Sequence, residues 1–332
     1  MTSNRTSTRA VEGSSLPMGK YLASSDKAVR DKAFENLRLF LASRDGDLLD
    51  EKEMIKLWKG LFFCFWHSDK PLVQQALATD LAELMLNINS TPTSFQFLKG
   101  FWQMIVEQWT KIDHLRLDKF YMLIRRFINA SFRLLIKLDW DQDYIELYEL
   151  ILTGPGGPLF PDDQRIPTSL ACHIGDVYLE ELEKVIAISE SASTIPVLDI
   201  LYPFMTYCAQ ISVNSAYKRI MEAVLCPFLA ATSNVALSSD QEPRLKRVKL
   251  LALEPPSYAI VISRANLRCI HDTDPFDPVV ATPDALRKAF LKTMFDVASQ
   301  PDAREVNRKK MYAVWKAAMA EGVDATWDPD AS

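Results

Sequence analysis

Residues 112–138, IDHLRLDKFYMLIRRFINASFRLLIKL, decide how the rest of the chain is interpreted. Their apolar side chains recur at intervals of three, four and seven residues, which is typical of a helix that buries one broad face. The residues of this face are Phe120, Leu123, Ile124, Phe127, Ile128, Leu134, Leu135 and Leu138. We therefore predict a long amphipathic helix whose apolar side packs on neighbouring helices.

The same stretch concentrates positive charge. Between residues 116 and 137 it has six basic side chains and one acid, although the whole chain has a formal net charge of −5. On a helical projection four of the six fall within about 40° of one another, and a fifth lies roughly 60° to one side. This pattern predicts a cationic stripe that suits RNA phosphate or an acidic partner. The candidate residues are Arg116, Lys119, Arg125, Arg126, Arg133 and Lys137. A solvated face whose cations pair with acids on neighbouring helices stays open as the alternative.

The composition predicts a soluble, intracellular, all-α protein. Of its 332 residues 48% are hydrophobic and only 10 are glycine, and runs of β-branched residues are scarce. Five cysteines without a C-x-x-C pair indicate buried thiols in a reducing compartment. The first twenty residues lack the apolar core of a secretory signal, and no run of about 18 apolar residues predicts a membrane span. We expect no membrane partner.

Helical segments follow one another along most of the chain, and two of them echo each other. Residues 57–62, LWKGLF, match residues 97–102, FLKGFW, at an offset of 40 residues. A period near 40 built from helix pairs is typical of HEAT and armadillo repeats. We therefore expect stacked antiparallel helix pairs in a HEAT/armadillo-like α-solenoid. Paired antiparallel helices without a true repeat are the more conservative interpretation.

The chain divides into five expected parts. They are a disordered N-terminal segment, a helical-repeat domain, an irregular linker, C-terminal helices that pack on the repeat domain, and a tail, with the limits 1–19, 20–232, 233–281, 282–321 and 322–332. A short strand is expected within the linker at residues 258–263. The linker also holds a basic cluster that is a second candidate RNA contact, formed by Arg244, Lys246, Arg247 and Lys249. A nuclear-import signal and a simple tether are the alternatives for this cluster.

No catalytic or metal-binding pattern is evident in the sequence. The four histidines are too few and too widely separated for a metal cage. The adjacent residues His67, Ser68 and Asp69 cannot easily form the hydrogen-bonded relay of a catalytic triad. Cys172 and His173 point about 100° apart on a helix, which argues against a thiol–imidazole pair. A solvated helix face is expected for the acids Glu180, Glu181 and Glu183. We therefore expect no enzyme, no metal, no cofactor and no small-molecule substrate.

Five stretches, in order along the chain, match blocks of a known family. They are residues 26–33 (DKAVRDKA), 57–74 (LWKGLFFCFWHSDKPLVQ), 112–127 (IDHLRLDKFYMLIRRF), 174–182 (IGDVYLEEL) and 308–316 (RKKMYAVWK). With these blocks the chain resembles the eukaryotic ribosomal RNA processing protein 1 family. The resemblance covers about residues 20–317 and is strongest before residue 140, while residues 233–263 do not align.

The resemblance implies a nucleolar assembly factor that helps to mature large-subunit ribosomal RNA without catalytic activity. The partners that it implies are pre-ribosomal RNA, other assembly factors and ribosomal proteins of the large-subunit precursor, and the location is the nucleus and nucleolus. Our first hypothesis is therefore a non-enzymatic scaffold that presents separate faces to RNA and to proteins. The alternative is a solenoid adaptor that binds protein or peptide partners only, which the net charge of −5 slightly favours.

Overall fold

The computed structural model describes residues 18–43, 48–161, 163, 166–191, 193–238, 258–269, 271 and 280–321. Within these ranges the regular structure is helical and no β-strand forms, so the predicted all-α class is confirmed. The basic cluster at 244–249 and the expected tail lie outside the described residues, as does almost all of the expected disordered start.

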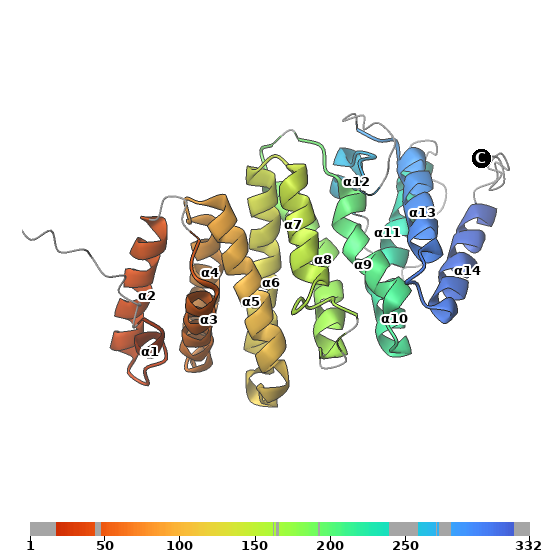
Figure 1. The fold of residues 1–332 in the computed structure, drawn as a ribbon. Coiled ribbons are helices and arrows are strands. Elements are labelled where there is room, and N and C mark those ends of the chain that lie inside the picture. The colour runs from red at the N-terminus through yellow and green to blue at the C-terminus, as the bar shows by residue number, and fades with distance from the viewer. Residues whose placement is uncertain are drawn as a thin grey trace, which may run out of the picture. The chain divides into compact units, whose positions relative to one another are not determined.

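The chain forms two compact units, residues 1–104 and residues 105–332. The first unit holds α1 (Met18–Leu22), α2 (Lys27–Ala42), α3 (Glu51–Trp66), α4 (Pro71–Leu86) and most of α5 (Thr91–Gln108) (Figure 1). The second holds η1 (Trp109–Lys111), α6 (His114–Lys137), α7 (Gln142–Thr153), α8 (Thr168–Ile188), α9 (Val197–Gln210), α10 (Asn214–Ile220), the π-helical η2 (Met221–Leu225), α11 (Cys226–Ser238), α12 (Ala259–Arg264), α13 (Pro283–Ser299) and α14 (Glu305–Glu321). The domain limits expected from the sequence stay a prediction.

Capping residues explain where several helices begin. The carboxylate of Asp26 accepts a hydrogen bond from the amide of Ala28 at 2.8 Å, which satisfies one of the free amides at the start of α2. Thr282 performs the same task for α13. Pro71 occupies the first turn of α4, where its missing N–H costs nothing. Local sequence therefore determines these helix starts before any tertiary packing.

Two glycines let helices of the first unit approach each other closely. A Cβ atom on Gly60 of α3 would lie 2.7 Å from the Cα of Gly19 in α1. A Cβ atom on Gly100 of α5 would lie 2.3 Å from the indole Cδ1 of Trp58, whose Nε1 donates to the carbonyl of Phe97 at 2.9 Å. Both glycines of the two matching Lys-Gly pairs thus lie at contacts between helices.

Stacked layers of helices bury the core of the second unit. In this unit α6 packs on α8, α7 packs on α9, and α13 contacts α9, α11 and α14 (Figure 1). The rings of Phe132, Tyr178 and Phe204 come from α6, α8 and α9, and meet edge to face with centroid distances of 4.9 and 4.6 Å. All three rings are fully buried. This aromatic row joins α6, α8 and α9 through one continuous core.

Residues 258–263, expected as a short strand, form a helix instead. The carboxylate of Glu183 in α8 accepts hydrogen bonds from the amides of Ile260 and Val261, both at 3.1 Å. These bonds satisfy amides at the start of α12 that would otherwise have no partner. Among the residues described around it, the β-pairing is limited to one isolated parallel bridge between Ile195 and Ala265. The strand prediction was wrong because a residue from a distant helix decides the local conformation.

Candidate nucleic-acid interface

Helix α6 carries the predicted site. Asp113 caps its first turn: the carboxylate accepts hydrogen bonds from the amides of Leu115 and Arg116 at 3.1 and 3.2 Å. The predicted apolar face is confirmed, because seven of its eight residues are buried and Leu138 is half-buried. The buried residues are Phe120, Leu123, Ile124, Phe127, Ile128, Leu134 and Leu135. The buried apolar face therefore fixes the position of α6, and with it the positions of the charged residues on its other side.

Three of the six predicted cations are exposed together on the second half of α6. They are Arg126, Arg133 and Lys137. Their spacing of seven and four residues places the three Cβ atoms within about 40° of one another around the helix. We call these three residues the α6 cationic face. Of the six candidates, these three are exposed, whereas Arg116 and Arg125 are partly buried and Lys119 is buried.

Arg125 is instead held by acids of α8. Its guanidinium lies 2.9 Å from a carboxylate oxygen of Glu180 and 3.2 Å from one of Glu181. Lys184 pairs with the same two acids at 2.7 and 3.0 Å. Hydrogen bonds from Lys184, the larger effect, and from Arg125 hold the pKa of Glu180 below its usual value. Arg125 thus takes the alternative role considered for the stripe, an ion pair with a neighbouring helix.

The first two turns of α6 expose fewer cations than the sequence predicts. Arg116 forms an ion pair with Asp113 at 2.5 Å. Lys119 is only 5% exposed, so it cannot belong to a solvent-facing stripe, which corrects the expectation for this residue. A helical projection gives the direction of a side chain and omits which part of the helix its neighbours cover.

The acids of α8 are the feature that sequence reasoning missed. Glu181 was expected on a solvated face, but it is 4% exposed and accepts a hydrogen bond from Asn129 of α6 at 2.9 Å. The carboxylate of Glu183 caps the start of α12, as described above. The expectation of a solvated acidic face is therefore wrong for these two residues. Their partners lie 52 and about 78 residues away in the sequence, so no local pattern could identify them.

Other candidate chemistry finds structural explanations. The imidazole Nε2 of His173 is 3.2 Å from the carbonyl oxygen of Tyr121, and the two rings lie 4.1 Å apart. Burial lowers the pKa of His173 and raises the pKa of Cys172, which works against a thiolate–imidazolium pair. The hydroxyl of Ser68 donates to the carbonyl of Phe65 at 2.6 Å. Across the described ranges, no three His, Cys, Asp or Glu side chains are grouped as metal ligands. In the same ranges, no helix is both long enough and apolar enough to cross a bilayer.

Comparison with known families decides the assignment. The family described as "Nucleolar protein, Nop52" matches residues 13–255, which is well over half of the chain. The chain belongs to this Nop52 family. The match includes the α6 cationic face and the acids of α8 that hold Arg125. The predicted kinship with ribosomal RNA processing protein 1 is confirmed, and the nucleolar location agrees with the description of the Nop52 family.

Individual relatives of this Nop52 family member carry the name of ribosomal RNA processing protein 1. Homolog B of Mus musculus is 40% identical over 179 residues, which are 53% of this chain and 24% of that protein. Homolog A of Mus musculus is 34% identical over 214 residues, or 63% of this chain and 42% of that protein. Homolog A of Homo sapiens is 29% identical over 326 residues, or 90% of this chain and 69% of that protein. The matched part of the chain thus spans about a quarter of the mouse homolog B.

Proposed function

We propose that this chain is a non-enzymatic scaffold in ribosome biogenesis. It supports pre-rRNA processing and maturation of the large-subunit precursor through contacts with pre-rRNA, other assembly factors and ribosomal proteins. The observation that carries this proposal is the α6 cationic face, since clustered, exposed cations on a fixed helix suit a phosphate backbone. The names of the relatives, ribosomal RNA processing protein 1, support the same role.

The task of α6 in this proposal is to hold its cations at a fixed spacing. The face runs from Arg126 to Lys137, about 16 Å along the helix axis. Behind it, Phe132 packs against Tyr178 of α8, and Arg125 joins α6 to α8 through Glu180 and Glu181. A preorganised surface of this kind loses little conformational entropy when a ligand binds.

A HEAT/armadillo-like α-solenoid of stacked antiparallel helix pairs is the architecture that we propose for the scaffold. The packing of α6 on α8 and of α7 on α9 supports it, because successive repeats in a solenoid contact each other through equivalent helices. The matching Lys-Gly pairs, 40 residues apart, support a repeat of this length in the first unit.

The test reverses the charge of the α6 cationic face. The variant Arg126→Glu, Arg133→Glu, Lys137→Glu is compared with the wild type for binding to single-stranded RNA over a series of salt concentrations. Neutralising three phosphates gives a slope of about −2 in log affinity against log salt, and we expect the variant to lose this contribution. In cells, the variant should no longer sediment with the large-subunit precursor.

A matched control reverses three exposed cations that share no face. The control variant is Lys32→Glu, Lys288→Glu, Lys316→Glu, in which each lysine is exposed on a different helix. Its net charge equals that of the test variant, because both replace three cations with glutamate. We expect this control to bind RNA with nearly the wild-type slope. Normal sedimentation of the test variant with the precursor, with a circular dichroism spectrum like that of the wild type, would contradict the role of the α6 cationic face.

A solenoid adaptor that binds only proteins is the second candidate function. It is favoured by the net charge of −5 and by the engagement of Arg116 and Arg125 in internal ion pairs. Ultraviolet crosslinking in living cells separates the two functions. Pre-ribosomal RNA crosslinked to peptides of α6 supports the scaffold, whereas protein adducts without RNA support the adaptor.

A further inference from the structure

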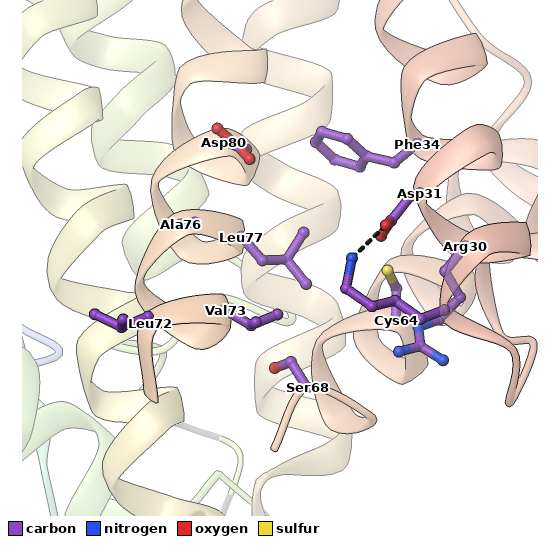
Figure 2. A pocket seen from close by; sticks show the side chains of 11 residues that line it. Arg30, Asp31, Phe34, Cys64, Ser68, Leu72, Val73, Ala76, Leu77 and Asp80 are labelled. Atoms are coloured by element: carbon purple, nitrogen blue, oxygen red, sulfur yellow. Dashed lines mark hydrogen bonds and ion pairs between the residues drawn. The ribbon is translucent and has the colours of Figure 1, made fainter. Parts of the chain in front are cut away.

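A hollow of about 410 Å³ opens in the first unit between α2 and α4 (Figure 2). Phe34 of α2 lines one side, and Val73 and Leu77 of α4 line the other. Cys64 of α3 and Ser68, which follows α3, also line it. The volume falls within the range of pockets that hold a ligand or a few side chains of a partner. We call this hollow the α2–α4 groove.

Helix α4 is apolar on two adjacent sides, of which one is buried in its own unit and the other is only partly covered. The buried side consists of Ala78, Leu81, Ala82, Leu84 and Met85. The second side lines the groove and consists of Leu72, Val73, Ala76 and Leu77. Leu72 is 79% exposed, and Ala76 is also exposed. Val73 and Leu77 are half-buried. A second apolar stripe at helical spacing that stays partly open to solvent is typical of a helix that binds a partner.

The charges beside the groove define what kind of partner fits. Lys27 is paired with Asp31 across one turn of α2. Arg30 is buried, and its guanidinium donates to the carbonyls of Ser24 and Ser25, both at 2.9 Å. Both cations are therefore already engaged within α2 and the turn before it.

Asp80 is the charge that remains for a partner. It is exposed at the end of the apolar stripe of α4 and forms no ion pair with the described residues of the first unit. Partial burial, and secondarily the nearby Glu83, raise the pKa of Asp80, which indicates a carboxylate without a compensating cation. A basic side chain from a partner would supply that cation.

We propose that the α2–α4 groove binds a short amphipathic helix of a protein partner, which inserts apolar side chains between Phe34 and Leu77 and places a lysine or arginine beside Asp80. Leu72 and Asp80 are eight residues apart, about 12 Å along α4, so two to three turns of the partner cover the groove. Binding of an apolar helix face in a groove between helices is a recurring mode of recognition. The groove lies in the first unit and the α6 cationic face in the second, so this inference goes beyond the proposed function.

The experiment uses the full chain in living cells. Leu72 is replaced by the photocrosslinking residue p-benzoylphenylalanine, and the crosslinked segment is identified by mass spectrometry. The control position is Ile55, which is 47% exposed and lies on the opposite side of α3 from Cys64, about 180° around the helix. We expect position 72, and not position 55, to crosslink one protein segment whose apolar residues recur every three or four positions, with a lysine or arginine about two turns from the crosslinked residue. Crosslinks to RNA, to an acidic segment, to scattered proteins, or no crosslinks at all would overturn the proposal.

Two variants then test the groove itself. Ala76→Trp fills it from an exposed position and should lower the crosslink yield at least tenfold. Asp80→Lys should lower it about two- to fivefold, the effect of one exposed ion pair. Glu190→Lys makes the same charge change at an exposed residue outside the groove and should leave the yield unchanged. If both groove variants crosslink like the wild type, the groove is not the binding site.

The same assay separates this proposal from the proposed function. Reversal of the α6 cationic face should leave the crosslink from position 72 intact while it abolishes RNA binding. If the peptide crosslink is lost and RNA binding is retained in Ala76→Trp, the groove and the α6 cationic face act independently. A crosslink that disappears when only the α6 cationic face is changed would contradict an independent groove.

Discussion

Arg268 compensates a carboxylate that is buried away from water. The side chain of Asp199 is 0% exposed; Nε of Arg268 lies 3.1 Å from its Oδ2, and the same guanidinium donates to the carbonyl of Trp140 at 2.8 Å. Replacing Arg268 with alanine removes this ion pair from the buried carboxylate. We expect Arg268→Ala to lower the free energy of unfolding by about 3–5 kcal/mol, measured by urea denaturation.

The matched control for this prediction removes the charge as well as its partner. Asp199→Asn combined with Arg268→Ala leaves no buried charge, so the double variant should recover a large part of the lost stability. A single variant as stable as the wild type would show that Asp199 is adequately solvated without Arg268.

His173 gives the folded chain a pH dependence of defined sign. Burial lowers the pKa of His173 below 6.5, so the unfolded chain binds the proton more readily than the folded chain. The stability that the neutral ring contributes is therefore present above pH 6.5 and is lost as the pH falls through the folded-state pKa. We expect the stability difference between the wild type and His173→Gln to decline when urea denaturation is repeated from about pH 7.5 to about pH 5.5. A difference that grows on acidification would mean that the folded chain holds His173 protonated.

At the scale of elements, the contact between α1 and α3 depends on the absence of side chains. In an exposed helix alanine is more favourable than glycine by about 1 kcal/mol. At Gly60, however, a Cβ atom would lie 2.7 Å from the Cα and 2.8 Å from the carbonyl oxygen of Gly19, both of them backbone atoms. We expect Gly60→Ala to destabilise the first unit by about 1–3 kcal/mol, measured by urea denaturation.

Removing α1 provides the control for this contact. In a chain that begins at residue 24 the clash cannot occur, so Gly60→Ala should be neutral or stabilising there. The same loss of stability in the full and the shortened chain would place the cause within α3 and not at its contact with α1.

At the scale of the whole molecule, the proposed solenoid predicts an elongated particle. A compact globule with the length of residues 18–321 has a radius of gyration of about 19 Å. We expect small-angle X-ray scattering of residues 18–321 to give a larger radius and a pair-distance distribution with a long tail. A symmetric distribution with a radius near that of the globule would rule out the solenoid and leave the all-α class unaffected.

The sequence by itself determined the helical class, the starts of several helices and the buried face of α6. Each of these depends on interactions within a few residues: apolar spacing along Phe120 to Leu135, a capping carboxylate at Asp113, and a proline in the first turn of α4. The family was also accessible, because its blocks are contiguous stretches such as residues 57–74. Local periodicity records these features directly.

Only the tertiary structure decided which cations are exposed and how residues 258–263 fold. Arg125 pairs with an acid 55 residues away, and Lys119 is buried. The carboxylate of Glu183 in α8 caps the start of α12. The α2–α4 groove likewise depends on three helices meeting around one space. The physical reason is that burial and charge pairing depend on neighbours in space, whereas a sequence pattern reports only neighbours along the chain.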